Sequence, residues 1–128
     1  MTDRGGKAVI LAVDDTPENL DVVKGALGDE YVIKAAINGM IALKIAEKAP
    51  PDLILLDIRM PGMDGFEVIE RLKANVETRD IPVIFLTGES DGDTEHRAME
   101  LGAKGFVIKP IDVDTLIDAV NRTLSYSG

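Results

Sequence analysis

The chain has 128 residues, and 45% of them are hydrophobic, which is enough apolar material for the core of one compact domain. Its formal net charge of -9 disfavours direct binding to nucleic acid or to a membrane surface, because both carry negative phosphate groups. The absence of cysteine excludes disulfides and Cys-ligated metals. The apolar run at residues 8–13 is too short for a signal sequence or a membrane span, so we expect a cytoplasmic protein.

Short apolar runs alternate along the chain with longer segments of helical period, as in a parallel sheet covered by helices on both faces. We predict an α/β fold of five such units, with strands at residues 8–13, 31–35, 53–56, 82–86 and 105–108. Because proline cannot donate to a strand ladder, Pro82 can only open its strand. The apolar stripes of the intervening helices are Leu20, Val23 and Leu27, then Ile41 and Ile45, and finally Val113, Leu116, Ile117, Val120 and Leu124.

Proline and glycine residues mark where these elements begin and end. Pro17 suits the first turn of a helix, and Pro50 with Pro51 bars helix before the third strand. Gly28 and Gly102 suit helix ends. The positions of these residues therefore agree with the apolar periodicity.

Polar residues follow or close four of the predicted strands. These residues are the pair Asp14-Asp15, Asp57, Thr87 and Lys109. Because ligands of an open α/β sheet bind beyond the carboxyl ends of its strands, we expect these side chains to converge. Three adjacent carboxylates repel one another unless a cation compensates them, and oxygen ligands without His or Cys favour Mg²⁺. The sequence therefore predicts a magnesium site.

A carboxylate beside a metal can attack phosphorus and form an acyl phosphate. In that chemistry Lys109 and Thr87 would contact the phosphoryl oxygens, and no histidine is required. We assign no role to His96, the single histidine. Calcium is a weaker alternative, because the stretch 91–93 lacks the spaced acids and the distal Glu of an EF-hand loop.

Four motifs together resemble the receiver domain of two-component response regulators, including its chemotaxis regulators. They are Val13-Asp14-Asp15, the stretch LDIRMPGMDG at 56–65, Leu86-Thr87-Gly88 and Lys109-Pro110. The resemblance covers residues 8–124 and leaves flexible ends at 1–7 and 125–128. It implies a flavodoxin-like, doubly wound sheet of five parallel strands in the order 2-1-3-4-5, flanked by five helices.

The resemblance also implies a function. Asp57 is expected to accept a phosphoryl group from a phosphohistidine of a sensor histidine kinase or a histidine phosphotransfer protein. Mg²⁺ is expected to bind Asp14, Asp15, Asp57 and the backbone carbonyl of Arg59, with Asp14 acting through water. Lys109 is expected to contact the phosphoryl group and to precede a cis peptide bond. Such a protein catalyses its own phosphotransfer and dephosphorylation without being a conventional enzyme.

Signalling in the family couples the position of Thr87 to an aromatic residue, here Phe106. Phosphorylation is expected to change the face formed by the fourth helix, the fifth strand and the fifth helix, which would control an output domain or a target protein. Dimerisation on phosphorylation is a further possibility. Arg59 and Glu89 occupy the positions that tune the lifetime of the acyl phosphate, and they could pair across the mouth of the site.

Three other classes of protein share some of these features with receiver domains. A phosphatase of the haloacid dehalogenase type needs an acid two residues after its nucleophile, where this chain has Arg59. A nucleotide- or flavin-binding domain needs a Gly-rich loop after the first strand, where this chain has acids. The third alternative is an inactive receiver-like interaction module, against which the complete set of acids, Thr87 and Lys109 argues.

Overall fold

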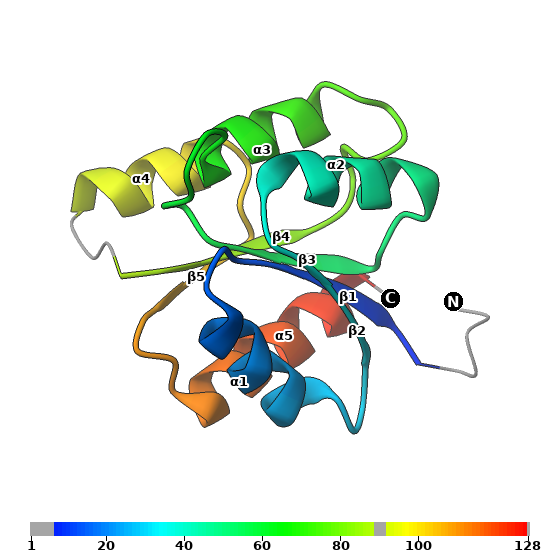
Figure 1. Ribbon diagram of the computed structural model, residues 1–128, viewed down its shortest axis with the longest axis vertical. Helices are drawn as coiled ribbons and strands as arrows, with labels where there is room; N and C mark the ends of the chain where they lie inside the picture. Colours follow the sequence, from blue (N-terminus) through cyan, green and yellow to red (C-terminus); the bar gives the residue numbers. More distant parts are fainter. Residues whose placement is uncertain (1–6, 89–91, 128) are drawn as a thin grey trace.

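Figure 1 shows the computed structural model, which describes residues 7–88 and 92–127. In these two ranges five strands alternate with five helices. The strands are β1 (Val9–Val13), β2 (Val32–Ala36), β3 (Leu53–Leu56), β4 (Val83–Thr87) and β5 (Gly105–Ile108). The helices are α1 (Pro17–Leu27), α2 (Gly39–Lys48), α3 (Gly65–Lys73), α4 (Gly92–Glu100) and α5 (Val113–Ser127).

The strands form one parallel sheet in the order β2-β1-β3-β4-β5. Helices α1 and α5 cover one face of the sheet, and α2, α3 and α4 cover the other (Figure 1). The doubly wound fold and the strand order expected from the sequence are therefore confirmed. Within the described residues, no helix is both long and apolar enough to cross a membrane.

Each face of the sheet has its own hydrophobic core. Alternate residues of β1 point to opposite faces, so that Leu11 and Val13 pack under α2, α3 and α4, whereas Ile10 and Ala12 pack over α1 and α5. All residues of β1, β3 and β4 are buried. This double burial explains why the three strands are almost purely aliphatic.

Two strands begin and end one residue later than predicted. The backbone amide of Tyr31 donates to the Leu27 carbonyl at 3.0 Å, so Tyr31 belongs to the turn after α1 and β2 begins at Val32. Pro82 has no amide proton for the sheet ladder, and β4 begins at Val83. β1 likewise begins at Val9 rather than at residue 8.

The predicted apolar face of α2 is wrong at Ile41, whereas Ile45 is partly buried and packs against the core. Ile41 is 38% exposed, and the buried residues of the helix are Gly39, Ala42, Leu43 and Ala46. Small residues face inward because α2 lies close to its neighbours: a Cβ on Gly39 would lie 2.7 Å from the Val68 side chain. In α5, Val113 is also exposed, because it occupies the first turn, while Leu116 and Val120 are fully buried. The stripe of α1 is buried as predicted.

Candidate functional site

The carboxyl edge of the sheet holds the polar residues that follow or close four strands. Asp14 follows β1, Asp57 follows β3, Thr87 ends β4 and Lys109 follows β5. Backbone hydrogen bonds extend the sheet ladder to three of them: Asp14 N to Ala36 O at 3.1 Å, Asp57 N to Val13 O at 3.0 Å, and Lys109 N to Thr87 O at 2.8 Å. The sheet therefore fixes the backbone from which these side chains project.

Three carboxylates converge at this edge. Asp14, Asp15 and Asp57 each offer an oxygen atom within 4.8 Å of the others. Asp14 and Asp57 are only 3% and 5% exposed, whereas Asp15 is exposed. The backbone amide of Thr16 donates to Asp14 Oδ1 at 2.9 Å and holds that side chain in place. An all-oxygen set with one open, solvent-facing member fits a hard cation such as Mg²⁺.

Lys109 places its ammonium between two of these acids. Its Nζ lies 2.7 Å from Asp14 Oδ2 and 3.4 Å from Asp57 Oδ1, and the side chain is 17% exposed. The Lys109-Pro110 peptide bond is cis, as expected. One positive charge thus faces three negative charges, which leaves the cluster with an excess of negative charge for a bound cation to compensate.

The pKa of the Asp57 carboxyl is raised above its usual value of 3.8. Burial is the main cause, because a low-dielectric surrounding disfavours the charged form, and repulsion from Asp14 adds to it. The Lys109 ammonium and a hydrogen bond from the Arg59 backbone act in the opposite direction. Asp57 is therefore a buried carboxylate that becomes easier to ionise when positive charge arrives.

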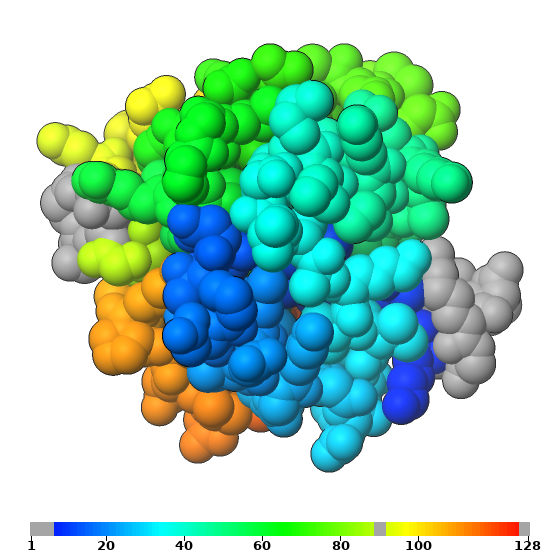
Figure 2. All heavy atoms as spheres, in the orientation of Figure 1, coloured from blue at the N-terminus to red at the C-terminus, as the bar shows by residue number. Residues whose placement is uncertain are grey.

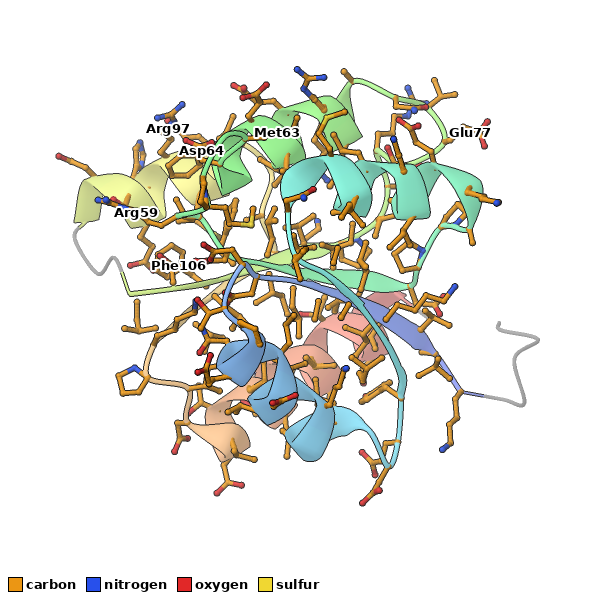
Figure 3. All side chains as sticks on the ribbon, viewed as in Figure 1. Arg59, Met63, Asp64, Glu77, Arg97 and Phe106 are labelled. Carbon is orange, nitrogen blue, oxygen red and sulfur yellow. The ribbon has the colours of Figure 1, made fainter. Side chains whose placement is uncertain are left out.

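Thr87 and Phe106 lie on neighbouring strands. Thr87 is fully buried and faces Ile108 in the register, while Phe106 is the register partner of Phe85. Phe106 is half-buried and packs against the core beneath α2, α3 and α4 (Figure 3). The two residues therefore lie on the strand pair that connects the acidic cluster with α4 and α5.

The predicted partner of Arg59 lies outside the described residues, since these exclude Glu89. Arg59 itself is exposed in the loop between β3 and α3, and it lines a hollow of about 620 Å³ that also contains Arg97 of α4 (Figure 3). The Arg59–Glu89 pair stays a prediction. The calcium alternative also rests partly on Asp91, which is outside the described residues. His96 is exposed on α4 and lies 3.3 Å from Glu100.

Sequence reasoning missed the role of Gly65. A Cβ at this position would lie 2.4 Å from the Asp57 backbone oxygen and 2.8 Å from the Ile58 Cα. Both are backbone atoms, which cannot rotate away as a flexible side chain can. The Gly65 amide also donates to the Ile58 carbonyl at 2.8 Å, and Asp64 caps α3 by accepting from the Glu67 amide. The sequence offered one signal of this close approach: a glycine directly after the helix cap Asp64, at a first helical position that normally accepts a side chain without loss of stability.

Segments that are distant in the sequence form the surface that faces the viewer in Figure 2: α1 in blue, α2 in cyan, the residues around α3 in green and those after β5 in orange.

A model of the response regulator receiver domain family matches residues 10–121. A probable cyclic di-GMP phosphodiesterase of Vibrio cholerae is 46% identical over 118 residues, which are 92% of this chain and 27% of that protein. Sporulation initiation phosphotransferase F of Bacillus subtilis is 40% identical over 116 residues, which are 90% of this chain and 92% of that protein.

Response regulator PleD of Caulobacter vibrioides is 41% identical and is covered to 26%, so the chain spans about a quarter of the length of this protein and of the Vibrio phosphodiesterase. The solved structure of the chemotaxis protein CheY4 of Vibrio cholerae superimposes with a TM-score of 0.86 at 32% identity, over 91% of this chain and 98% of that one. The sheet order, the acidic cluster and these matches agree: the chain belongs to the family of response regulator receiver domains, and it is a phosphorylation-dependent signalling switch.

Proposed function

We propose that Asp57 is the residue that accepts the phosphoryl group. The observation that carries this proposal is the meeting of three carboxylates within 4.8 Å with the Lys109 ammonium 3.4 Å from Asp57. Asp57 is a buried carboxylate held at the end of a strand of the sheet, and it is well positioned to attack the phosphorus of a donor. The compensating positive charge lies where the charge of a transferred phosphoryl group would develop.

The reaction is a transfer between two nucleophiles. A carboxylate oxygen of Asp57 attacks phosphorus of a phosphohistidine, the P–O bond forms and the P–N bond breaks. The imidazole leaves with the electron pair and takes up a proton from water. Lys109 neutralises charge on the phosphoryl oxygens, and the Thr87 hydroxyl donates a hydrogen bond to one of them. The chain thus catalyses its own modification without being a conventional enzyme.

Receiver domains typically bind Mg²⁺ at an acidic cluster, and the donor set of this chain fits that ion. We assign its binding to the carboxylates of Asp14, Asp15 and Asp57 and to the backbone carbonyl of Arg59. When bound, the ion supplies positive charge that offsets the mutual repulsion of the acids and of the incoming phosphoryl group. The charge imbalance around Lys109 supports this assignment.

The switch runs from Thr87 through Phe106 to the face formed by α4, β5 and α5. Phosphorylated Asp57 draws the Thr87 hydroxyl toward it, and the space that opens favours a more buried position of Phe106. This biases an equilibrium between two arrangements of that face that exist beforehand. Within the described residues of α4, Ala98 is the single buried one, so little core packing opposes a shift of this helix.

Receiver domains interact with histidine kinases or phosphotransfer proteins and with output domains. We assign the donor of this chain to one of the first two classes and its listener to an output domain or a target protein, with dimerisation on phosphorylation as one form of response. We place the functional unit at residues 8–124 and the protein in the cytoplasm. Arg59, together with Glu89, is assigned to the lifetime of the acyl phosphate.

Intact-mass spectrometry after incubation with acetyl phosphate tests this function. One added phosphoryl group is expected, it should require Mg²⁺, and it should be absent from Asp57→Asn. Asp118→Asn is the matched control, because Asp118 is an exposed acid of α5 that pairs with Arg122 at 3.0 Å. An adduct that persists in Asp57→Asn would refute the assignment of Asp57. If the wild type shows no phosphoryl adduct and also fails to bind beryllofluoride, which mimics a phosphoryl group, the inactive interaction module would be favoured.

A further inference from the structure

A row of side chains runs from the edge strand β5 to helix α4. Phe106 of β5 and Phe85 of β4 are register partners on neighbouring parallel strands, and both project from the same face of the sheet. The ring of Phe85 lies 5.7 Å from the ring of Phe66 in α3, and the two planes meet at 66°. The guanidinium carbon of Arg97 in α4 lies 4.3 Å from the centre of the Phe66 ring. The row therefore connects the proposed switch residue Phe106 with α4 by way of α3.

Each contact in this row has the geometry of an attractive pair. The edge of one aromatic ring carries partial positive charge and the face of another carries partial negative charge, so the edge-to-face arrangement of Phe66 and Phe85 is favourable. The same negative face attracts the Arg97 guanidinium above Phe66. Phe85 is fully buried, Phe66 is partly buried and Arg97 is exposed, so Arg97 closes the row at the surface of the molecule.

The contact between Arg97 and Phe66 lies between two hollows. One hollow, of about 620 Å³, borders the loop between β3 and α3, and the other, of about 510 Å³, borders the outer face of α3. Phe66 and Arg97 line both, and Arg97 lies beside the start of α3 (Figure 3). Ala98 is the single buried residue within the described part of α4. The stacking of Arg97 is therefore one of a small number of contacts that hold α4 against α3.

The stacked arrangement is the one from which the proposed switch starts. Phe106 is half-buried, and the proposed switch moves it to a more buried position. The face that changes with Phe106 includes α4, and a shift of α4 relative to α3 separates the Arg97 guanidinium from the Phe66 ring. Because the contact exists only in the starting arrangement, it stabilises that arrangement relative to the shifted one.

We propose that Arg97 is a positioning residue, which by stacking on Phe66 sets how readily Asp57 takes up a phosphoryl group. The inference rests on the proposed function, because it needs a switch that links Asp57 to α4. A ligand that binds the shifted arrangement more tightly has an apparent affinity that falls with the population of that arrangement. An exposed contact between a cation and a ring shifts such an equilibrium by about two- to fivefold. Loss of the contact therefore strengthens the binding of a phosphoryl group or its mimic by that factor.

Isothermal titration calorimetry of the full chain with beryllofluoride in Mg²⁺ tests the proposal. Arg97→Gln removes the cation and Phe66→Leu removes the ring, and each is expected to lower the Kd about two- to fivefold. The double variant should show less than the sum of the two effects, because both substitutions remove the same contact. Arg97→Lys keeps a cation above the ring, so its Kd should lie closer to that of the wild type than the Kd of Arg97→Gln does.

Arg71→Gln is the matched control. Arg71 is an exposed arginine of α3 that lines the smaller hollow and pairs with Glu67 at 2.8 Å, so its loss removes the same charge and leaves the cation above Phe66 in place. Its Kd should equal that of the wild type. Loss of a positive charge by itself weakens the binding of an anion, so tighter binding by Arg97→Gln has the opposite sign from this general effect.

The two ways in which the experiment can fail are distinct. If the wild type binds beryllofluoride and the Kd of Arg97→Gln is unchanged or raised, with circular dichroism showing intact folding, the role of Arg97 is overturned and the proposed function stands. If neither the wild type nor any variant binds beryllofluoride, and the wild type shows no phosphoryl adduct, the proposed function is overturned and the role of Arg97 with it.

Discussion

The substitution Asp57→Asn should make the protein more stable in the absence of metal. The side chain is 5% exposed, and its carboxylate lies within 4.8 Å of those of Asp14 and Asp15. Burial of the ionised carboxylate is the main cost. At an effective dielectric constant of about 20, the repulsion from a carboxylate 4.8 Å away is about 3.5 kcal/mol, and the Lys109 attraction at 3.4 Å, about 5 kcal/mol, opposes burial and repulsion together. Solvent screens the exposed Asp15, so we expect the free energy of unfolding to rise by about 1 to 2 kcal/mol.

The gain should depend on pH in a defined direction. Because folding raises the pKa of Asp57 above 3.8, the ionised carboxylate opposes folding. In acid below 3.8 the carboxyl is protonated in both states, and the wild type and the variant should be equally stable. As the pH rises from the unfolded pKa through the folded pKa, the wild type loses stability relative to the variant, and at neutral pH the full difference should be present.

Magnesium far above its dissociation constant should reverse this order of stability. A ligand that binds only the folded state stabilises it by about 4 kcal/mol at a concentration about a thousand times its dissociation constant. The variant lacks one carboxylate of the proposed site and should gain less. Urea denaturation followed by far-ultraviolet circular dichroism, in EDTA and in Mg²⁺, measures both effects, and Asp118→Asn serves as the surface control. A variant no more stable than the wild type in EDTA would refute the electrostatic reasoning.

Four further predictions use the same denaturation assay. Gly65→Ala forces a Cβ to 2.4 Å from the Asp57 backbone oxygen and should cost about 2 to 3 kcal/mol; a neutral result would mean that the loop is free to move. Gly25→Ala meets nothing within 4 Å inside α1 and should stabilise by about 0.5 to 1 kcal/mol, so a loss would contradict this helix environment. Leu116→Ala empties a fully buried position of α5 and should cost about 2 to 5 kcal/mol, a penalty that an exposed leucine would not show. Thr78→Val removes a buried hydroxyl that donates to the Leu72 carbonyl at 2.8 Å and should cost about 1 to 3 kcal/mol, which a water-accessible hydroxyl would not.

The sheet was predictable from the sequence because strands that are buried on both faces appear as short aliphatic runs. β1 and β3 are aliphatic throughout, as strands covered on both faces must be, and polar residues follow them at once. The rule that ligands bind beyond the carboxyl ends of parallel strands then brought Asp14, Asp57 and Lys109 together, although 95 residues separate the first from the last. Pattern and topology were sufficient for these features.

Close approaches between packed segments do not produce a comparable pattern in the sequence. The apolar periodicity favoured Ile41 as a buried residue of α2, but the distance of that helix from α3 selects Gly39 and Ala42 instead. The demand for glycine at position 65 arises from the backbone of Asp57, which lies eight positions earlier in the chain. Such requirements depend on distances between packed elements, which a single sequence does not encode position by position.

The spread of the site over four strand ends has a consequence during synthesis. Asp57 leaves the ribosome before Lys109, and at about 5 to 20 residues per second the delay is about 3 to 10 seconds. During that interval β5 cannot yet pair with β4, and the ammonium that lies 3.4 Å from Asp57 in the finished fold has not been made. If Asp57 is the acceptor, as proposed, we expect a nascent chain to accept a phosphoryl group poorly until β5 has paired with β4.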